Sequence, residues 1–126
     1  MTKEVDVMKA RVLKIPASGG WEFIEVEMAG GGVPLGFLQS AVGGWIECVG
    51  LFGTGMPELD IYLNEEGKLM GLPPNIVATR LSGIDRHGDL IVGDAVVCAR
   101  SGQGKTKGLS ASHETALRKL LDGSVA

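Results

Sequence analysis

Residues 59–75, with the sequence LDIYLNEEGKLMGLPPN, constrain the fold of this chain more than any other segment. Residues 59–63 alternate between aliphatic and other side chains, and a period of two places alternate side chains on opposite faces of a β-strand. Residues 64–67 have the composition of a tight turn, because Asn can hydrogen-bond its own backbone and Gly accepts a left-handed conformation. Residues 68–70 then read as a returning strand. The pattern therefore predicts a β-hairpin in which Gly67 takes a positive φ.

The end of the same stretch predicts the entry to a short helix. Residues 71–74, GLPP, end the returning strand because proline has no amide hydrogen to donate to a neighbouring strand. Asn75 has the side chain of a good N-cap, and residues 76–81 can form a short helix behind it. Gly83 is expected to end that helix in a left-handed conformation.

The remaining apolar patterns predict a small mixed domain. Strands are expected at residues 8–15, 21–28, 45–51 and 90–99, the first two as a hairpin, and residues 33–42 have the spacing of a helix. Twenty glycines in 126 residues fit short strands joined by tight turns. We therefore expect an α+β fold: a small, twisted or partly closed antiparallel sheet of five or six strands with two short helices, plus a C-terminal helix on a glycine-rich linker.

The composition changes after Ala99, which predicts a domain boundary there. Residues 8–99 are expected to form a single α+β domain, and residues 100–126 a polar linker and a helical tail. Ser110 or Ser112 can cap the tail helix, and Gly123 can end it. A chain truncated after Arg100 is expected to stay folded.

Several ordered motifs carry a family resemblance. The motifs VGGWIE (residues 42–47), DIYLNEEGK (60–68), GLPPN (71–75) and IVGDAVV (91–97) follow one another at close spacing. Together they resemble the domain-of-unknown-function family DUF3846, short proteins of bacteria, phages and plasmids. The resemblance implies a fold unit and a phage or mobile-element context, and it implies no activity.

Composition weighs against several classes of function. A net charge of −3 argues against a non-specific grip on nucleic acid, which needs clustered Lys and Arg. No apolar run reaches the roughly 20 residues that would span a bilayer, and the charged start is unlike a signal peptide, so we expect a soluble cytoplasmic protein without membrane association. Cys48 and Cys98 are expected to be buried free thiols in a reducing compartment. Neither has metal-ligand spacing, and we expect no metal and no cofactor.

No catalytic set stands out in the sequence. Glu65 and Glu66 are adjacent, but an acid–base pair needs converging carboxyl groups in a cleft. A small hydrolase using Glu65, Glu66 or Asp60 stays an alternative, to be favoured by a deep pocket. A regulator of nucleic acid is another alternative, using a basic tail that contains Lys105, Lys107, Arg118 and Lys119.

The hypothesis that we favour is a small non-enzymatic binding or accessory protein. Glycines, prolines and charged residues make residues 64–75 a rigid projection, and rigidity lowers the entropy cost of binding. It would recognise a protein partner or a small anionic ligand, and a homo-oligomer stays open. Trp21 and Trp45 are expected in the core, but an exposed tryptophan would indicate a binding face. The candidate binding residues are Asn64, Glu65, Glu66, Lys68, Pro73, Pro74, Asn75, Trp45 and Glu47.

Overall fold

The computed structural model describes residues 8–51 and 54–124. The strands are β1 (Lys9–Ile15), β2 (Glu22–Glu27), β3 (Ile46–Gly50), β4 (Leu59–Asn64), β5 (Ala95–Arg100) and β6 (Thr106–Lys107). The helices are α1 (Leu35–Val42), α2 (Ile76–Ser82) and α3 (Ala111–Ser124), with a 3-10 helix, η1 (Ile84–His87), after α2. The strands form one open sheet in the order β2-β1-β5-β4-β3, and β6 also pairs with β5. All pairings are antiparallel, which confirms the predicted fold class.

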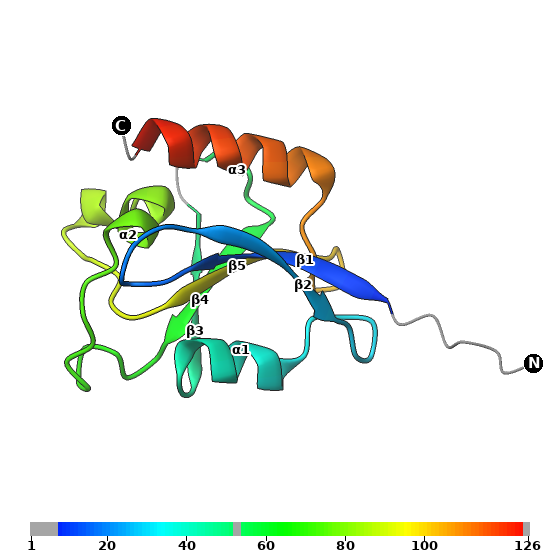
Figure 1. The fold of residues 1–126 in the computed structure, drawn as a ribbon, viewed down its shortest axis with the longest axis horizontal. Coiled ribbons are helices and arrows are strands. Elements are labelled where there is room, and N and C mark those ends of the chain that lie inside the picture. The colour runs from blue at the N-terminus through cyan, green and yellow to red at the C-terminus, as the bar shows by residue number, and fades with distance from the viewer. Residues whose placement is uncertain (1–7, 52–53, 125–126) are drawn as a thin grey trace, which may run out of the picture.

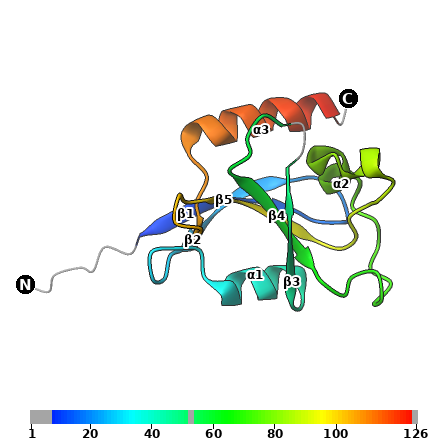
Figure 2. The ribbon, with the colours of Figure 1, turned by 180° about the vertical axis from the view of Figure 1, so that it is seen from behind.

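Helices cover both faces of the sheet, with α1 on one side and α2 and α3 on the other (Figures 1 and 2). Consecutive residues of the central strands therefore alternate between two cores. Ile61 of β4 lies in the larger core on the side of α2 and α3, together with Leu81 and Leu117. Tyr62 lies in the smaller core on the side of α1, together with Leu38. Burial on both faces makes β4 and β5 the centre of the molecule.

The predicted returning strand at residues 68–70 is wrong. β4 is already paired with β3 on one side and with β5 on the other, so its ladder has no free edge for a third strand. Residues 64–71 instead coil into a turn in which the amide of Met70 donates to the carbonyl of Glu66, and the amide of Leu72 donates to that of Gly67. We call residues 64–71 the Asn64–Gly71 turn.

The predicted positive φ at Gly67 is also wrong, and Gly71 has it instead, at +68°. Gly67 is buried, and a Cβ atom placed on it would lie 2.9 Å from Cγ2 of Val92. Glycine is therefore needed at Gly67 for close packing and at Gly71 for backbone conformation. The residue type alone does not distinguish these two reasons.

The helix entry at Asn75 is confirmed. The Oδ1 atom of Asn75 accepts from the amide of Ala78 at 3.0 Å, and Gly83 ends α2 at φ +76°. The Nδ2 atom donates to the carbonyls of Ile15 and Gly93, at 2.8 and 2.9 Å. One buried amide thus joins the end of β1, the start of α2 and the segment before β5.

The last predicted strand, residues 90–99, is shorter at its start. Gly93 has φ +78°, which breaks the extended chain, and β5 begins at Ala95. Before the break, Val92 forms an isolated bridge with Pro74. The predicted loop at residues 82–89 contains η1.

The C-terminal helix docks on the sheet. Leu117 and Leu121 are fully buried in the larger core, where Leu109 also lies. Arg11 of β1 binds Glu114 of α3 through an Nη2–Oε1 ion pair of 2.9 Å. The predicted linker is partly ordered, because residues 106–107 form β6 beside β5. The helix and its linker are thus built into the sheet domain, whereas the ability of residues 8–99 to fold alone stays a prediction.

Two predictions of burial need correction. Trp45 is 66% exposed, because it precedes the edge strand β3 and no core lies over it. Cys48 is exposed on the same edge strand, whereas Cys98 on the central strand β5 is buried as predicted. Trp21 is partly buried and packs edge-on against Phe23, with ring centroids 5.9 Å apart.

Candidate functional site

A cleft of about 260 Å³ lies beside the edge strand β3, on the sheet face opposite α1. Its polar lining consists of Glu47, Asn64, Glu65, Lys68 and Asp89. Its apolar lining includes Val49, Leu63, Leu69, Ile84, Leu90 and Val92. We call this the acidic cleft. An apolar surface with a few convergent polar groups is the usual form of a ligand site.

The local sequence explains how these side chains meet. Glu47 and Val49 are two residues apart on β3, so they lie on the same face of the strand. Leu63, opposite Glu47 in the ladder, shares that face. The Asn64–Gly71 turn supplies Lys68 and Leu69, and the segment after η1 supplies Asp89. The cleft is therefore formed by one sheet edge and two loops that are distant in the sequence.

Asn64 holds the turn in place. It is only 3% exposed, and its Nδ2 atom donates to the carbonyl of Val42 at 3.1 Å. Its Oδ1 atom accepts from the amide of Glu66 at 2.8 Å, as the turn prediction required. Because both polar atoms of the Asn64 side chain already form hydrogen bonds within the protein, its contribution to the cleft is to position Glu65 and Lys68.

The charges of the cleft are predominantly negative. Glu47, Glu65 and Asp89 supply three carboxylates against the single ammonium of Lys68, which leaves a net charge of −2. Lys68 forms an ion pair with Asp89, and this hydrogen bond, with that from the amide of Leu90, holds the pKa of Asp89 below its ordinary value. Glu47 and Glu65 are exposed to solvent. Among the described residues, neither carboxylate forms an ion pair with a Lys, Arg or His side chain.

The structure thus brings four of the nine candidate binding residues together: Glu47, Asn64, Glu65 and Lys68. Glu66, Pro73 and Pro74 are exposed outside the cleft lining. Asn75 is 1% exposed, and its side-chain amide forms hydrogen bonds with Ile15, Gly93 and Ala78. Its role is therefore to hold the fold together, not to contact a ligand. Trp45 lines a separate open recess of about 200 Å³ with Gln39 and Gly44.

Sequence reasoning missed Asp89 and the apolar wall. Asp89 is 21 residues from Lys68 in the chain, and only the fold brings the two together. Leu90 lies at the start of the predicted strand 90–99, yet it is 43% exposed at the cleft. The only indication in the sequence is an aspartate between Gly88 and Leu90, and this pattern is too common in loops to identify a binding site.

A second polar cluster lies on the other face of the sheet. Asp60 is 5% exposed and accepts from Nη1 of Arg100 at 2.8 Å on both carboxylate oxygens. Although Cys48 is exposed as a residue, partial desolvation of its thiol by neighbouring protein atoms, and then the charge of Asp60, raise its pKa to about 11. This thiol is therefore protonated at neutral pH and is a poor nucleophile. Asp60 and Glu65 lie on opposite sides of the sheet, so these two candidate acids cannot act as a pair in one site.

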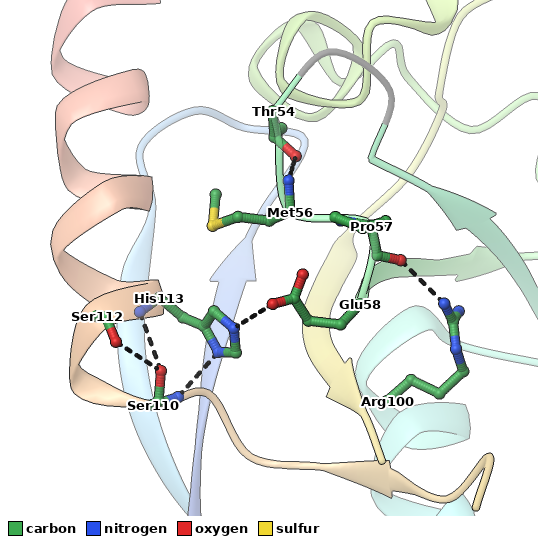
Figure 3. A network of polar contacts seen from close by, with 8 residues as sticks. All are labelled: Thr54, Met56, Pro57, Glu58, Arg100, Ser110, Ser112 and His113. Carbon is green, nitrogen blue, oxygen red and sulfur yellow. Dashed lines mark hydrogen bonds and ion pairs between the residues drawn. The ribbon is translucent and has the colours of Figure 1, made fainter. Parts of the chain in front are cut away.

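A third polar network fixes the start of α3 (Figure 3). The Oγ atom of Ser110 accepts from the amide of His113 at 3.1 Å, and the amide of Ser110 donates to Nδ1 of His113 at 3.1 Å. The Nε2 atom of His113 then carries the hydrogen and donates to Glu58 at 3.2 Å. This reciprocal cap confirms Ser110 as the predicted helix start. The Ser110 hydroxyl does not reach the imidazole in these contacts, so the three residues lack the order of a catalytic triad.

The basic residues of the tail are spread over the molecule. Lys105 and Lys107 lie at β6, whereas Arg118 stacks over Phe23 with its guanidinium carbon 4.6 Å from the ring centroid. In residues 8–51 and 54–124, no group of His, Cys, Asp and Glu could hold a metal ion. Within the same residues, no helix is both long and apolar enough to cross a membrane.

Comparison with known proteins identifies the family. A search of curated proteins and a search of solved structures each gave no significant match. A family model described as "Domain of unknown function (DUF3846)" matches residues 8–122, which include every strand and most of α3. The chain therefore belongs to the DUF3846 family.

Proposed function

We propose that the protein is a small non-enzymatic binding protein whose acidic cleft holds a segment of a protein partner. The observation that carries the proposal is the cleft itself, which joins an apolar wall to three carboxylates and one lysine. Burial of apolar surface away from water favours binding, and the charged groups at the rim of the cleft determine which partner binds.

The charges favour one of the two partners expected from the sequence. An anionic ligand would meet Glu47 and Glu65 and would find Lys68 already paired with Asp89. Like charges brought together at an interface oppose binding. A protein segment with a Lys or Arg beside an apolar side chain complements both parts of the cleft.

The context of the family resemblance extends this proposal. Bacteria, phages and plasmids use many small accessory proteins, and a cytoplasmic accessory role in a phage or mobile element fits a binding protein of this size. That context is analogy with the family and does not follow from the site.

Selection from a displayed library of random peptides tests the proposal. We expect the peptides that bind the parent protein to be enriched in Lys or Arg next to an aliphatic residue. They should bind Glu47→Lys and Glu65→Lys at least about tenfold more weakly, a factor that corresponds to about 1.4 kcal/mol.

Glu27→Lys is the matched control, because Glu27 is an exposed glutamate on the opposite edge strand, β2. It makes the same change in net charge without altering the cleft. Peptides that bind all three variants as they bind the parent, or an enrichment in acidic peptides, would refute the proposal.

A further inference from the structure

We propose, building on the function proposed above, that the partner segment binds as an additional antiparallel β-strand on the free edge of β3. The inference deepens the proposed function by naming the form of the partner: an extended segment in which an apolar residue precedes a basic residue by two positions. It follows from the pairing of β3, the register of the sheet and the charges beside the strand.

The outer side of β3 is available for pairing. Among the residues that the structure describes, β3 ends the strand order, and its five residues pair with β4 on one side only. The amide of Glu65 donates to the carbonyl of Trp45 at 2.8 Å. This hydrogen bond shows that the backbone groups of Trp45 face β4, and it therefore determines which residues of β3 do so. Because the direction of backbone groups alternates along a strand, those of Glu47 and Val49 face β4 and those of Ile46, Cys48 and Gly50 face outward.

This phase places an added strand at the acidic cleft. The side chains of Glu47 and Val49 line the cleft. The backbone N–H and C=O groups of these two residues point toward β4, away from an added strand. Residues of an added strand opposite them would therefore form non-hydrogen-bonded pairs, in which side chains approach most closely. A residue opposite Glu47 is best basic, and a residue opposite Val49 is best apolar. In an antiparallel strand, the apolar residue comes first.

The two edges of the sheet differ in how they resist pairing. β2 carries Glu22, Glu25 and Glu27, all exposed, and charged residues of this kind protect an edge strand from other chains. β3 carries only Glu47. The edge at the cleft is therefore the less protected of the two.

Charge also decides between a partner and a second copy of this chain. Pairing of β3 with itself about Cys48 would place the Glu47 side chains of both copies diagonally on one face, with the acidic clefts adjoining. Like charges directly opposite each other in a ladder are destabilising, and long side chains such as glutamate also reach their diagonal neighbours. A basic partner strand removes this repulsion and is the occupant that the edge fits.

A synthetic peptide can test this mode of binding. The probe is a blocked heptapeptide of threonines with valine at its third position and lysine at its fifth, titrated against the full chain. Hydrogen exchange should show that the amides of Cys48 and Gly50 exchange rapidly in the free protein and become protected on binding. The amides of Glu47 and Val49 should be protected throughout, since they face β4.

N-methylation gives the matched control. Methylation of the peptide amide at the fourth position, which would donate to β3, should weaken binding at least about tenfold, whereas methylation at the fifth, which points away from β3, should not. Lysine replaced by glutamate should weaken binding to the parent similarly.

The possible failures are distinguishable. If the lysine matters but the two methylated peptides bind alike, the cleft binds the peptide and strand addition is wrong. If no peptide of the set binds while the library still yields basic peptides that depend on Glu47, strand addition in this register is wrong and the proposed function stands. Protection of Cys48 and Gly50 in the free protein, together with a dimer in sedimentation, would overturn the proposal in favour of self-pairing.

Discussion

At the scale of single residues, Gly67 shows that a glycine can be required for packing. A Cβ atom on Gly67 would lie 2.9 Å from Val92 Cγ2 and 3.3 Å from the carbonyl oxygen of Asn64. Overpacking of this kind typically costs about 1–3 kcal/mol. We expect Gly67→Ala to lower the free energy of unfolding by about 1–2 kcal/mol in denaturant titrations.

The cost of Gly67→Ala should be smaller when Val92 is already alanine, because that change removes the nearest atom. A double-mutant cycle measures this coupling. Equal costs in the two backgrounds would show that Val92 is not the obstacle.

Asn75 allows a sharper prediction at the same scale. Loss of an N-cap alone costs about 1 kcal/mol, but Asn75→Ala also removes the two hydrogen bonds that Nδ2 donates to the carbonyls of Ile15 and Gly93. Each buried group left unsatisfied adds about 1–3 kcal/mol, so we expect a loss of about 3 kcal/mol. A loss near 1 kcal/mol in chemical denaturation would reduce Asn75 to a simple cap.

At the scale of elements, the ion pair between β1 and α3 makes stability depend on pH. The hydrogen bond from Arg11 holds the pKa of Glu114 below its ordinary value of 4.5. A depressed pKa in the folded state contributes stability above the unfolded pKa, and this stability is lost as pH falls through the folded value. Glu114→Gln should therefore flatten the decline of stability below about pH 4.5.

Thermal melts from pH 7 down to pH 3 provide this measurement. Glu25→Gln is a suitable control, because Glu25 lies in an exposed, longer ion pair with Lys9 and such pairs contribute little. If Glu114→Gln follows the parent at every pH, the ion pair does not hold α3 to the sheet.

The docking of α3 is testable with neighbouring leucines. Leu121 is fully buried in the larger core, whereas Leu120 is 38% exposed on the same turn. Leu121→Ala should cost about 3 kcal/mol, within the range of buried leucine truncations, and Leu120→Ala less than about 1 kcal/mol. Similar costs for the two variants in urea titrations would contradict the docked position.

Local patterns predicted most elements and the hairpin of β1 and β2, but not the pairing of the other strands. The alternation in β2 and β4, the cap at Asn75 and the stop at Gly83 depend on neighbours in the sequence, and all were predictable. The choice between a hairpin strand and the Asn64–Gly71 turn depended on β3 and β5 occupying both sides of β4, which no local pattern reveals. The exposure of Trp45 likewise followed from the edge position of β3.

At the scale of the whole molecule, the sheet packs against the C-terminal helix, although the amino-acid composition changes between them after Ala99. Leu109, Leu117 and Leu121 share one core with residues of β1, β4 and β5, and the family match extends to residue 122. Urea titration of a chain truncated after Arg100, which lacks these leucines, tests the prediction that residues 8–99 fold alone. The candidate site shows the same dependence: of its four charged residues, only Glu65 and Lys68 are close in sequence, and the fold brings Glu47 and Asp89 to them.

The central claim is that the acidic cleft selects a basic partner segment, and a charge swap tests it most directly. Fluorescence anisotropy would measure the affinities of parent and Glu47→Lys for the heptapeptide with lysine and for its counterpart with glutamate. We predict that the parent prefers the lysine peptide and that Glu47→Lys reverses the preference, each by at least about tenfold. A variant that keeps the preference of the parent would contradict the claim.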